Sequence, residues 1–120
     1  MSLAATGHEV TTEPGHERVR VRFNGTVIAD TTRPVILHET GLPTVYYVPR
    51  EDARMDLLAR STHQTRCPFK GMANYFDIVV DGKRSANTVW TYEDPIAAAA
   101  AIKNHLAFYP DRVDIERDAK

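Results

Sequence analysis

The sequence predicts a mainly β domain: a single twisted, partly closed antiparallel sheet with one helix packed on it in the C-terminal half. Two observations favour strands. Apolar and polar residues alternate over residues 19–23, and the dipeptides Asn-Gly at 24–25 and Asp-Gly at 81–82 are typical of two-residue hairpin turns. A run of alanines at 97–101 favours the helix, because alanine has the highest helix propensity.

The elements follow in order from turn signals and apolar patterns. Residues 19–23 and 27–29 form the first predicted hairpin, and shorter strands are expected at 35–38 and 45–48. Met55, Leu57 and Leu58 share the spacing of a brief helix or turn that Asp52 can cap, and residues 61–66 then read as extended. Residues 73–80 and 83–90 flank the second hairpin turn, which we expect to be central.

The predicted helix begins at Asp94 and Pro95 and runs to about Leu106. The aspartate can cap the helix, and proline fits its first position. Alanine methyl groups would let the helix approach the sheet closely, with Ile102 and Leu106 as larger contacts. A last strand is expected from Val113 onwards.

Composition limits the classes of protein. The chain has 120 residues, enough for one domain, and its 42% apolar and 26% charged residues are typical of a globular fold. A net charge of −1 offers no overall field for a nucleic acid or an anionic membrane, and the longest apolar run, residues 96–102, is far short of the ~20 residues that span a bilayer. We expect neither as a partner; a homodimer stays open.

Residues 1–17 lack periodicity and contain Pro14 and Gly15, which predicts a flexible tail or a partly docked arm before a single domain at 18–118. The tail mixes acidic residues and histidines with small ones and so does not resemble a signal peptide. A single cysteine cannot close an internal disulfide. These features favour a cytoplasmic location.

The pentapeptide Cys-Pro-Phe-Lys-Gly at 67–71 is the most informative motif, because it places the only thiol three residues from a lysine in a proline-to-glycine turn. The Lys70 ammonium would favour the thiolate of Cys67 and make it a nucleophile, whereas a lone cysteine is otherwise a small buried apolar residue. His38 and His63 are the candidate bases.

Lys70 has two further uses. It can hold an anion, or form an imine with a carbonyl group if burial lowers its pKa; the plainer alternative is a solvated surface charge. Glu39 can act as a general base or form an ion pair with Lys70, and the alternative is an exposed carboxylate at a strand end. Gly71 is expected to have a positive φ angle.

The aromatic residues predict a pocket. Trp90 and Tyr92 share a strand face and can stack on a planar ligand, although such pairs more often fill a core. Tyr46 and Tyr47 are adjacent, so at most one of them is expected to face a given pocket. Tyr109 can close one edge of the site or fasten the helix to the last strand, and we favour fastening.

Neither a metal nor a cofactor is expected. Asp114, Glu116 and Asp118 fall on one face of the last strand and are the nearest approach to a carboxylate metal site. A solvated strand face is the favoured interpretation.

The order of several motifs resembles a widespread bacterial family, domain of unknown function 427, over about residues 19–117. The motifs are Asn-Gly at 24–25, His-Glu-Thr at 38–40, Tyr-Tyr-Val-Pro-Arg at 46–50, Cys-Pro-Phe-Lys-Gly at 67–71, Ala-Asn-Thr-Val-Trp at 86–90 and Phe-Tyr-Pro-Asp-Arg-Val at 108–113. The resemblance implies a small domain of the β-tent kind, and the family carries a nucleotidyltransferase label. β-Tent relatives that hold zinc use paired cysteines, and common nucleotidyltransferases use a Gly-Ser loop; this chain has one cysteine and no Gly-Ser pair.

We expect a small-molecule pocket where the turn at 67–71 meets Glu39 and the aromatic residues, and binding of a small polar metabolite through Lys70 and the aromatic pair. Whether the protein is also an enzyme that acts on this metabolite stays open. The alternative is a non-catalytic binding or interaction module, and a nucleotide-dependent transferase is the third hypothesis. The expected site residues are Cys67, Lys70 and Glu39 for catalysis, with Trp90, Tyr92, Tyr46, Tyr109 and Gly71 for ligand binding.

Overall fold

A computed structural model describes residues 8–118 of the chain, which form strands and three short 3-10 helices. The strands are β1 (Val10–Pro14), β2 (Arg18–Phe23), β3 (Thr26–Thr31), β4 (Val35–Glu39), β5 (Val45–Pro49), β6 (Leu58–Cys67), β7 (Gly71–Val80), β8 (Lys83–Tyr92), β9 (His105–Phe108) and β10 (Asp114–Asp118). The 3-10 helices are η1 (Arg50–Asp52), η2 (Met55–Leu57) and η3 (Ala97–Ile102).

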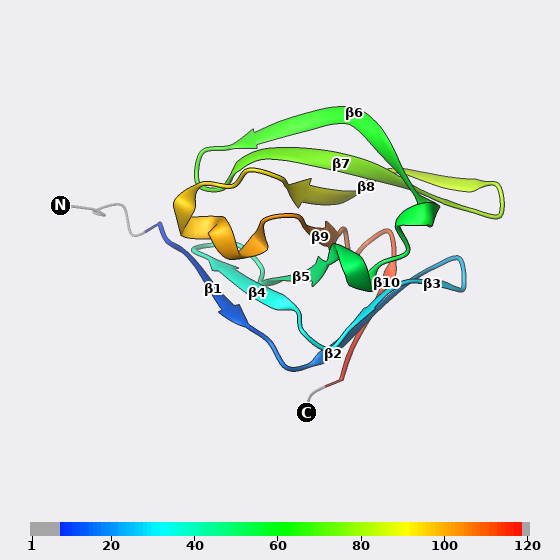
Figure 1. Ribbon diagram of the computed structural model, residues 1–120, viewed down its shortest axis with the longest axis horizontal. Helices are drawn as coiled ribbons and strands as arrows, with labels where there is room; N and C mark the ends of the chain where they lie inside the picture. The colour runs from blue at the N-terminus through cyan, green and yellow to red at the C-terminus, as the bar shows by residue number, and fades with distance from the viewer. Residues whose placement is uncertain (1–7, 119–120) are drawn as a thin grey trace.

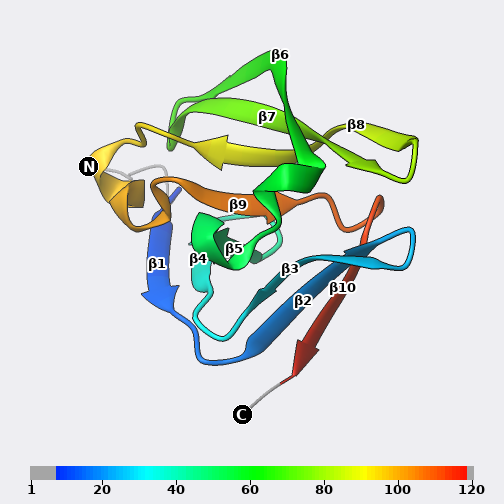
Figure 2. The ribbon, with the colours of Figure 1, turned by 45° about the vertical axis from the view of Figure 1, so that its right-hand side comes forward.

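The strands of the described residues divide between two antiparallel sheets (Figure 1). The larger sheet has the order β1-β4-β5-β9-β8-β7-β6, and the smaller one has the order β10-β2-β3. Figure 2 shows β5 and β9 between the β6–β8 strands and the smaller sheet. The predicted mainly β class is confirmed, although the strands form two sheets where we expected one.

Both predicted hairpins are present, and their turns have the backbone angles that the dipeptides predict. Asn24 and Gly25 have φ angles of 51° and 82° between β2 and β3. Asp81 and Gly82 have φ angles of 49° and 79° between β7 and β8. Two consecutive positive φ angles match the twist of paired strands. The second hairpin is not central, because only β6 lies between it and one edge of the sheet.

The predicted helix at 94–106 is wrong. Only η3 forms there, and Asn104 (φ 59°) leads the chain into β9. Leu106 and Ala107 are fully buried in β9, which pairs with β5 on one side and β8 on the other. Strand pairing on both sides, with two buried side chains, outweighs helix preferences that differ by less than about 1 kcal/mol per residue.

The N-terminal arm is docked from residue 10 onwards. β1 pairs with β4 along its whole length, with Thr12 opposite Leu37. Ordered structure therefore begins before residue 18, which corrects the predicted start of the domain. The part of the predicted tail at residues 1–7 lies outside the described residues.

The interior has two parts, which we call the aliphatic core and the aromatic core. The aliphatic core consists of Val19, Val21, Ile28, Ala29, Val48, Phe76, Ile78, Val80, Val89, Leu106, Phe108 and Val113. The aromatic core consists of Leu37, Tyr47, Ala73, Tyr75, Tyr92, Ala99, Ile102 and Ala107. Among residues 8–118, no helix has the length and apolar character needed to cross a bilayer.

Candidate functional site

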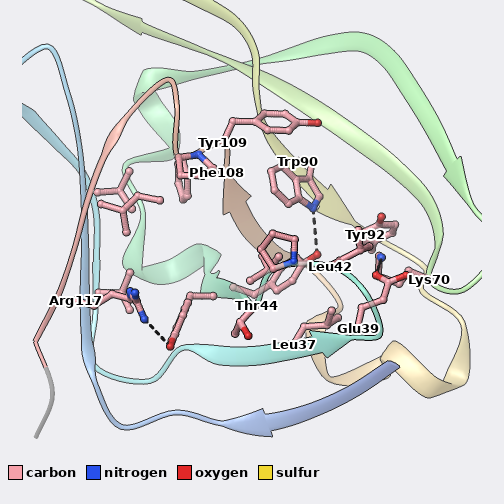
Figure 3. Close-up of a pocket in the computed structure, with 18 of the residues that line it drawn as sticks. Leu37, Glu39, Leu42, Thr44, Lys70, Trp90, Tyr92, Phe108, Tyr109 and Arg117 are labelled. Carbon is pink, nitrogen blue, oxygen red and sulfur yellow. Dashed lines mark hydrogen bonds and ion pairs between the residues drawn. The ribbon is translucent and has the colours of Figure 1, made fainter. Parts of the chain in front are cut away.

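A pocket of about 590 Å³ opens between the two sheets (Figure 3). Its aromatic lining residues are Tyr46, Tyr47, Tyr75, Trp90, Tyr92, Phe108 and Tyr109. A volume of this size suits a small organic ligand, and pockets for such ligands are lined mainly by apolar and aromatic side chains with a few polar groups. The pocket touches both cores, since Val21 of one and Leu37 of the other line it.

A buried ion pair forms the inner polar end of the lining. The Lys70 ammonium donates a hydrogen bond to Oε1 of Glu39, and these residues are only 9% and 8% exposed. His8 Nε2 lies 2.9 Å from the other Glu39 oxygen. Burial acts to raise the pKa of the Glu39 carboxyl, but the hydrogen bonds from Lys70 and His8 outweigh it and hold the pKa below its ordinary value. Glu39 is therefore ionised at neutral pH.

The turn that carries Lys70 is fixed by backbone contacts. The Lys70 amide donates to the Cys67 carbonyl at 3.2 Å, and the Lys70 carbonyl accepts from the Ile96 amide at 2.9 Å. Gly71 has a φ angle of 117°, which confirms its predicted positive φ, and a Cβ atom there would lie 3.3 Å from the Asp94 carbonyl oxygen. Gly71 thus serves close backbone packing and does not line the pocket.

The aromatic wall is organised by ring contacts and one hydrogen bond. The Trp90 indole N–H donates to the Tyr47 hydroxyl at 3.1 Å, and the Tyr109 ring centroid lies 4.6 Å from that of Trp90. Burial raises the pKa values of the Tyr47 and Tyr92 hydroxyls. Burial, together with hydrogen bonding to Tyr75, raises the pKa of Tyr109 to about 12. These phenols are neutral at physiological pH and can donate hydrogen bonds to a ligand.

Tyr46 and Tyr47 both line the pocket, which corrects the prediction that at most one of them could. Tyr47 is buried in the aromatic core, whereas half-buried Tyr46 packs against the aliphatic core. The two faces of β5 reach the same pocket because the pocket spans the boundary between the cores. Near Tyr46 stands Arg117 of β10, whose guanidinium donates to the Tyr46 hydroxyl at 2.7 Å.

The sequence of the chain matches a known protein family. Residues 11–119 match the family described as a domain of unknown function, DUF427. The chain is a member of the DUF427 family. The short label of this family refers to nucleotide transfer. A comparison with curated proteins found no match to the chain.

The other predicted catalytic residue of this DUF427 chain does not line the pocket. Cys67 is half-buried, packs against the aromatic core and is not among the lining residues. The predicted bases point elsewhere: His38 Nε2 lies 2.7 Å from a Glu13 oxygen, and the His63 ring packs on Tyr75. Of the predicted set, the structure thus brings together Lys70, Glu39 and four aromatic residues, Trp90, Tyr92, Tyr46 and Tyr109.

The acidic residues of β10 are exposed in the DUF427 domain. Asp114, Glu116 and Asp118 lie along the strand, and Glu116 accepts a hydrogen bond from Arg22 at 3.3 Å. Within residues 8–118, no three histidine, cysteine or acidic side chains gather in a way that could hold a metal ion. Sequence reasoning missed His8 and Arg117, whose partners Glu39 and Tyr46 are far away in the chain.

Proposed function

We propose that this protein binds a small molecule with a flat, largely apolar body in the pocket between the sheets. The observation that carries the proposal is the convergence of aromatic rings and a buried ion pair, Lys70 with Glu39, in one pocket of about 590 Å³. Aromatic faces favour stacking on planar groups, and the pocket excludes much of the water that would compete for polar contacts.

The ion pair gives the ligand a polar partner at the inner end of the pocket. An ammonium group has three N–H donors, and the hydrogen bond to Glu39 uses one of them. A carbonyl, hydroxyl or amide oxygen of the ligand can accept another. Lys70 would then orient the ligand while the rings supply most of the contact area.

Catalysis at the same pair is the second candidate. Glu39 is ionised and lies beside Lys70, so it can accept a proton from a carbon next to a ligand carbonyl while Lys70 donates a hydrogen bond to the carbonyl oxygen. Deuterium exchange into a bound ketone in heavy water, lost in Glu39→Gln, would support this reaction. Nucleotide transfer stays a third candidate, which a rise in melting temperature with ATP and magnesium would support.

Trp90 offers a direct test, because it is the single tryptophan of the chain and lines the pocket. Nile red, a flat and uncharged dye with a ring carbonyl, should bind saturably at one site. The dye emission should rise and shift to the blue, and Trp90 emission should fall in parallel. A dye signal without any change at Trp90 would place the dye elsewhere and contradict the proposal.

Two threonine variants provide a matched pair. Thr44 is exposed and lines the pocket, whereas Thr11 is exposed on β1 and does not line it. Thr44→Phe should partly fill the pocket and weaken Nile red binding at least about tenfold, which is a loss of 1.4 kcal/mol of binding free energy. Thr11→Phe should bind like the wild type. Equal affinity in both variants would overturn the proposed site.

A further inference from the structure

The charges that line the pocket are unevenly matched. In the described part of the chain, the charged lining residues are Glu39, Lys70 and Arg117. Glu39 and Lys70 form an ion pair and cancel each other's charge. The charge that remains in the pocket is therefore that of Arg117.

Arg117 differs from most arginines of the described chain in its partner. A carboxylate oxygen lies within 3.5 Å of the guanidinium in each of Arg18, Arg20, Arg22, Arg33, Arg50, Arg54, Arg60 and Arg84. Arg117 has its nearest carboxylate, Glu17, at 4.0 Å, the outer limit of an ion pair. Its hydrogen bond goes instead to a neutral phenol, Tyr46, at 2.7 Å.

Tyr46 holds the guanidinium in place without neutralising it. The Arg117 guanidinium carbon lies 4.5 Å from the centre of the Tyr46 ring, so the ring face and the hydroxyl both fix its position. Register adds a third constraint, because Arg117 pairs with Val19, whose side chain also lines the pocket. A guanidinium has five N–H donors, and four of them are left after the bond to Tyr46.

The two polar groups stand at opposite ends of the lining. Figure 3 shows Arg117 at one end and the Glu39–Lys70 pair at the other. The Arg117 side chain is 49% exposed, whereas Lys70 and Glu39 are almost wholly buried. Arg117 therefore lies at the mouth of the pocket and the ion pair at its inner end.

Resting on the proposed function, we infer that the ligand is a flat carboxylate that binds with its charged end at Arg117 and a neutral polar group at Lys70 and Glu39. The planar guanidinium fork matches the two oxygens of a carboxylate. A second anion beside Glu39 would meet a carboxylate already buried there, which disfavours the reverse orientation. Of the two ligand groups that the sequence left open for Lys70, an anion and a carbonyl, this assigns the neutral oxygen to Lys70 and the anion to Arg117.

Displacement of Nile red by two matched probes tests the inference. The naphthoate anion and its neutral amide share one ring system and differ in charge. Naphthoate should bind the wild type about tenfold more tightly than naphthamide, and the preference should shrink in high salt because Arg117 is half exposed. Arg117→Gln should abolish the preference by weakening naphthoate alone.

Two controls locate the effect. Arg66→Gln removes an exposed arginine that does not line the pocket, and it should keep the preference. Because neither probe carries a second polar group, the double variant Lys70→Met with Glu39→Gln should change the affinity of both probes by the same factor and keep the preference. A preference that survives Arg117→Gln, disappears in the double variant, or is absent from the wild type overturns the inference while leaving pocket binding intact. If Nile red itself does not bind, the proposed function fails first.

Discussion

The two cores of this domain differ in chemistry, although both draw on the larger sheet. The buried residues of the aliphatic core are valine, isoleucine, leucine, alanine and phenylalanine. The aromatic core combines three tyrosines with three alanines, and a buried ion pair lies at its edge of the pocket. The aromatic core thus contributes phenol groups to the pocket, whereas the aliphatic core contributes only the apolar side chains of Val19, Val21 and Phe108.

Stability and binding therefore depend in part on different residues. A change at an aliphatic-core residue that does not line the pocket should alter the free energy of unfolding and leave the pocket contacts in place. A change at the Lys70–Glu39 pair should alter both.

Lys70→Met should lower the free energy of unfolding by about 3–5 kcal/mol, because it leaves the buried carboxylate of Glu39 without its main partner. Adding Glu39→Gln should restore most of that loss, since the remaining pair of side chains is neutral. Urea unfolding of the two variants measures both values. A double variant as unstable as the single one would show that the pair itself holds the fold together.

Ile78→Ala should cost about 2–5 kcal/mol, because Ile78 is fully buried in the aliphatic core and does not line the pocket. Nile red affinity of the folded fraction should stay at the wild-type value. Ile96→Ala is the matched control, since that side chain is 44% exposed and should cost under about 1 kcal/mol. Weaker dye binding by Ile78→Ala would contradict the separation of the cores.

Glu93 should make the free energy of unfolding of the domain depend on pH in the acid range. Hydrogen bonds from Arg60 and Arg50, which outweigh desolvation, lower the pKa of Glu93 to about 2 from an ordinary 4.5. Since the folded pKa lies below the unfolded one, the stabilisation is present above pH 4.5 and is lost as the pH falls toward 2.

Glu93→Gln should therefore flatten the dependence of unfolding free energy on pH in that window. Urea unfolding at several pH values between 2 and 5 would measure the slope for the variant and the wild type. An unchanged slope in Glu93→Gln would mean that its two arginines contribute nothing through this carboxylate. Glu39 also has a lowered pKa, so some acid sensitivity should remain in the variant.

Local signals were sufficient for part of the fold. Each hairpin follows from a dipeptide that accepts two positive φ angles, and the structure has those angles at Asn24 and Asp81. The ion pair with Lys70 was one of three possibilities for Glu39, beside a general base and an exposed carboxylate, and the structure shows this ion pair. The resemblance to DUF427 is likewise confirmed.

Long-range pairing explains what the sequence could not predict. The alanine run at 97–101 indicates an α-helix that continues to Leu106. In the structure the alanines form only the 3-10 helix η3, and residues 105–108 pair with β5 and β8 as strand β9. β1 has a weak local pattern and depends on β4 for its partner. Arg117 had a signal that went unused: the alternation that groups Glu116 with its acidic neighbours also places Ile115 and Arg117 on the opposite face, which lines the pocket.

The position of β9 has a consequence for biosynthesis. Residues 105–108, strand β9, lie between β5-β4-β1 on one side and β8-β7-β6 on the other. During synthesis the larger sheet therefore stays in two separate halves until β9 leaves the ribosome. β10 completes the smaller sheet later still. Nascent chains that end before residue 105 should therefore expose two open strand edges and depend on chaperones, and cooperative folding should begin only when β9 has emerged.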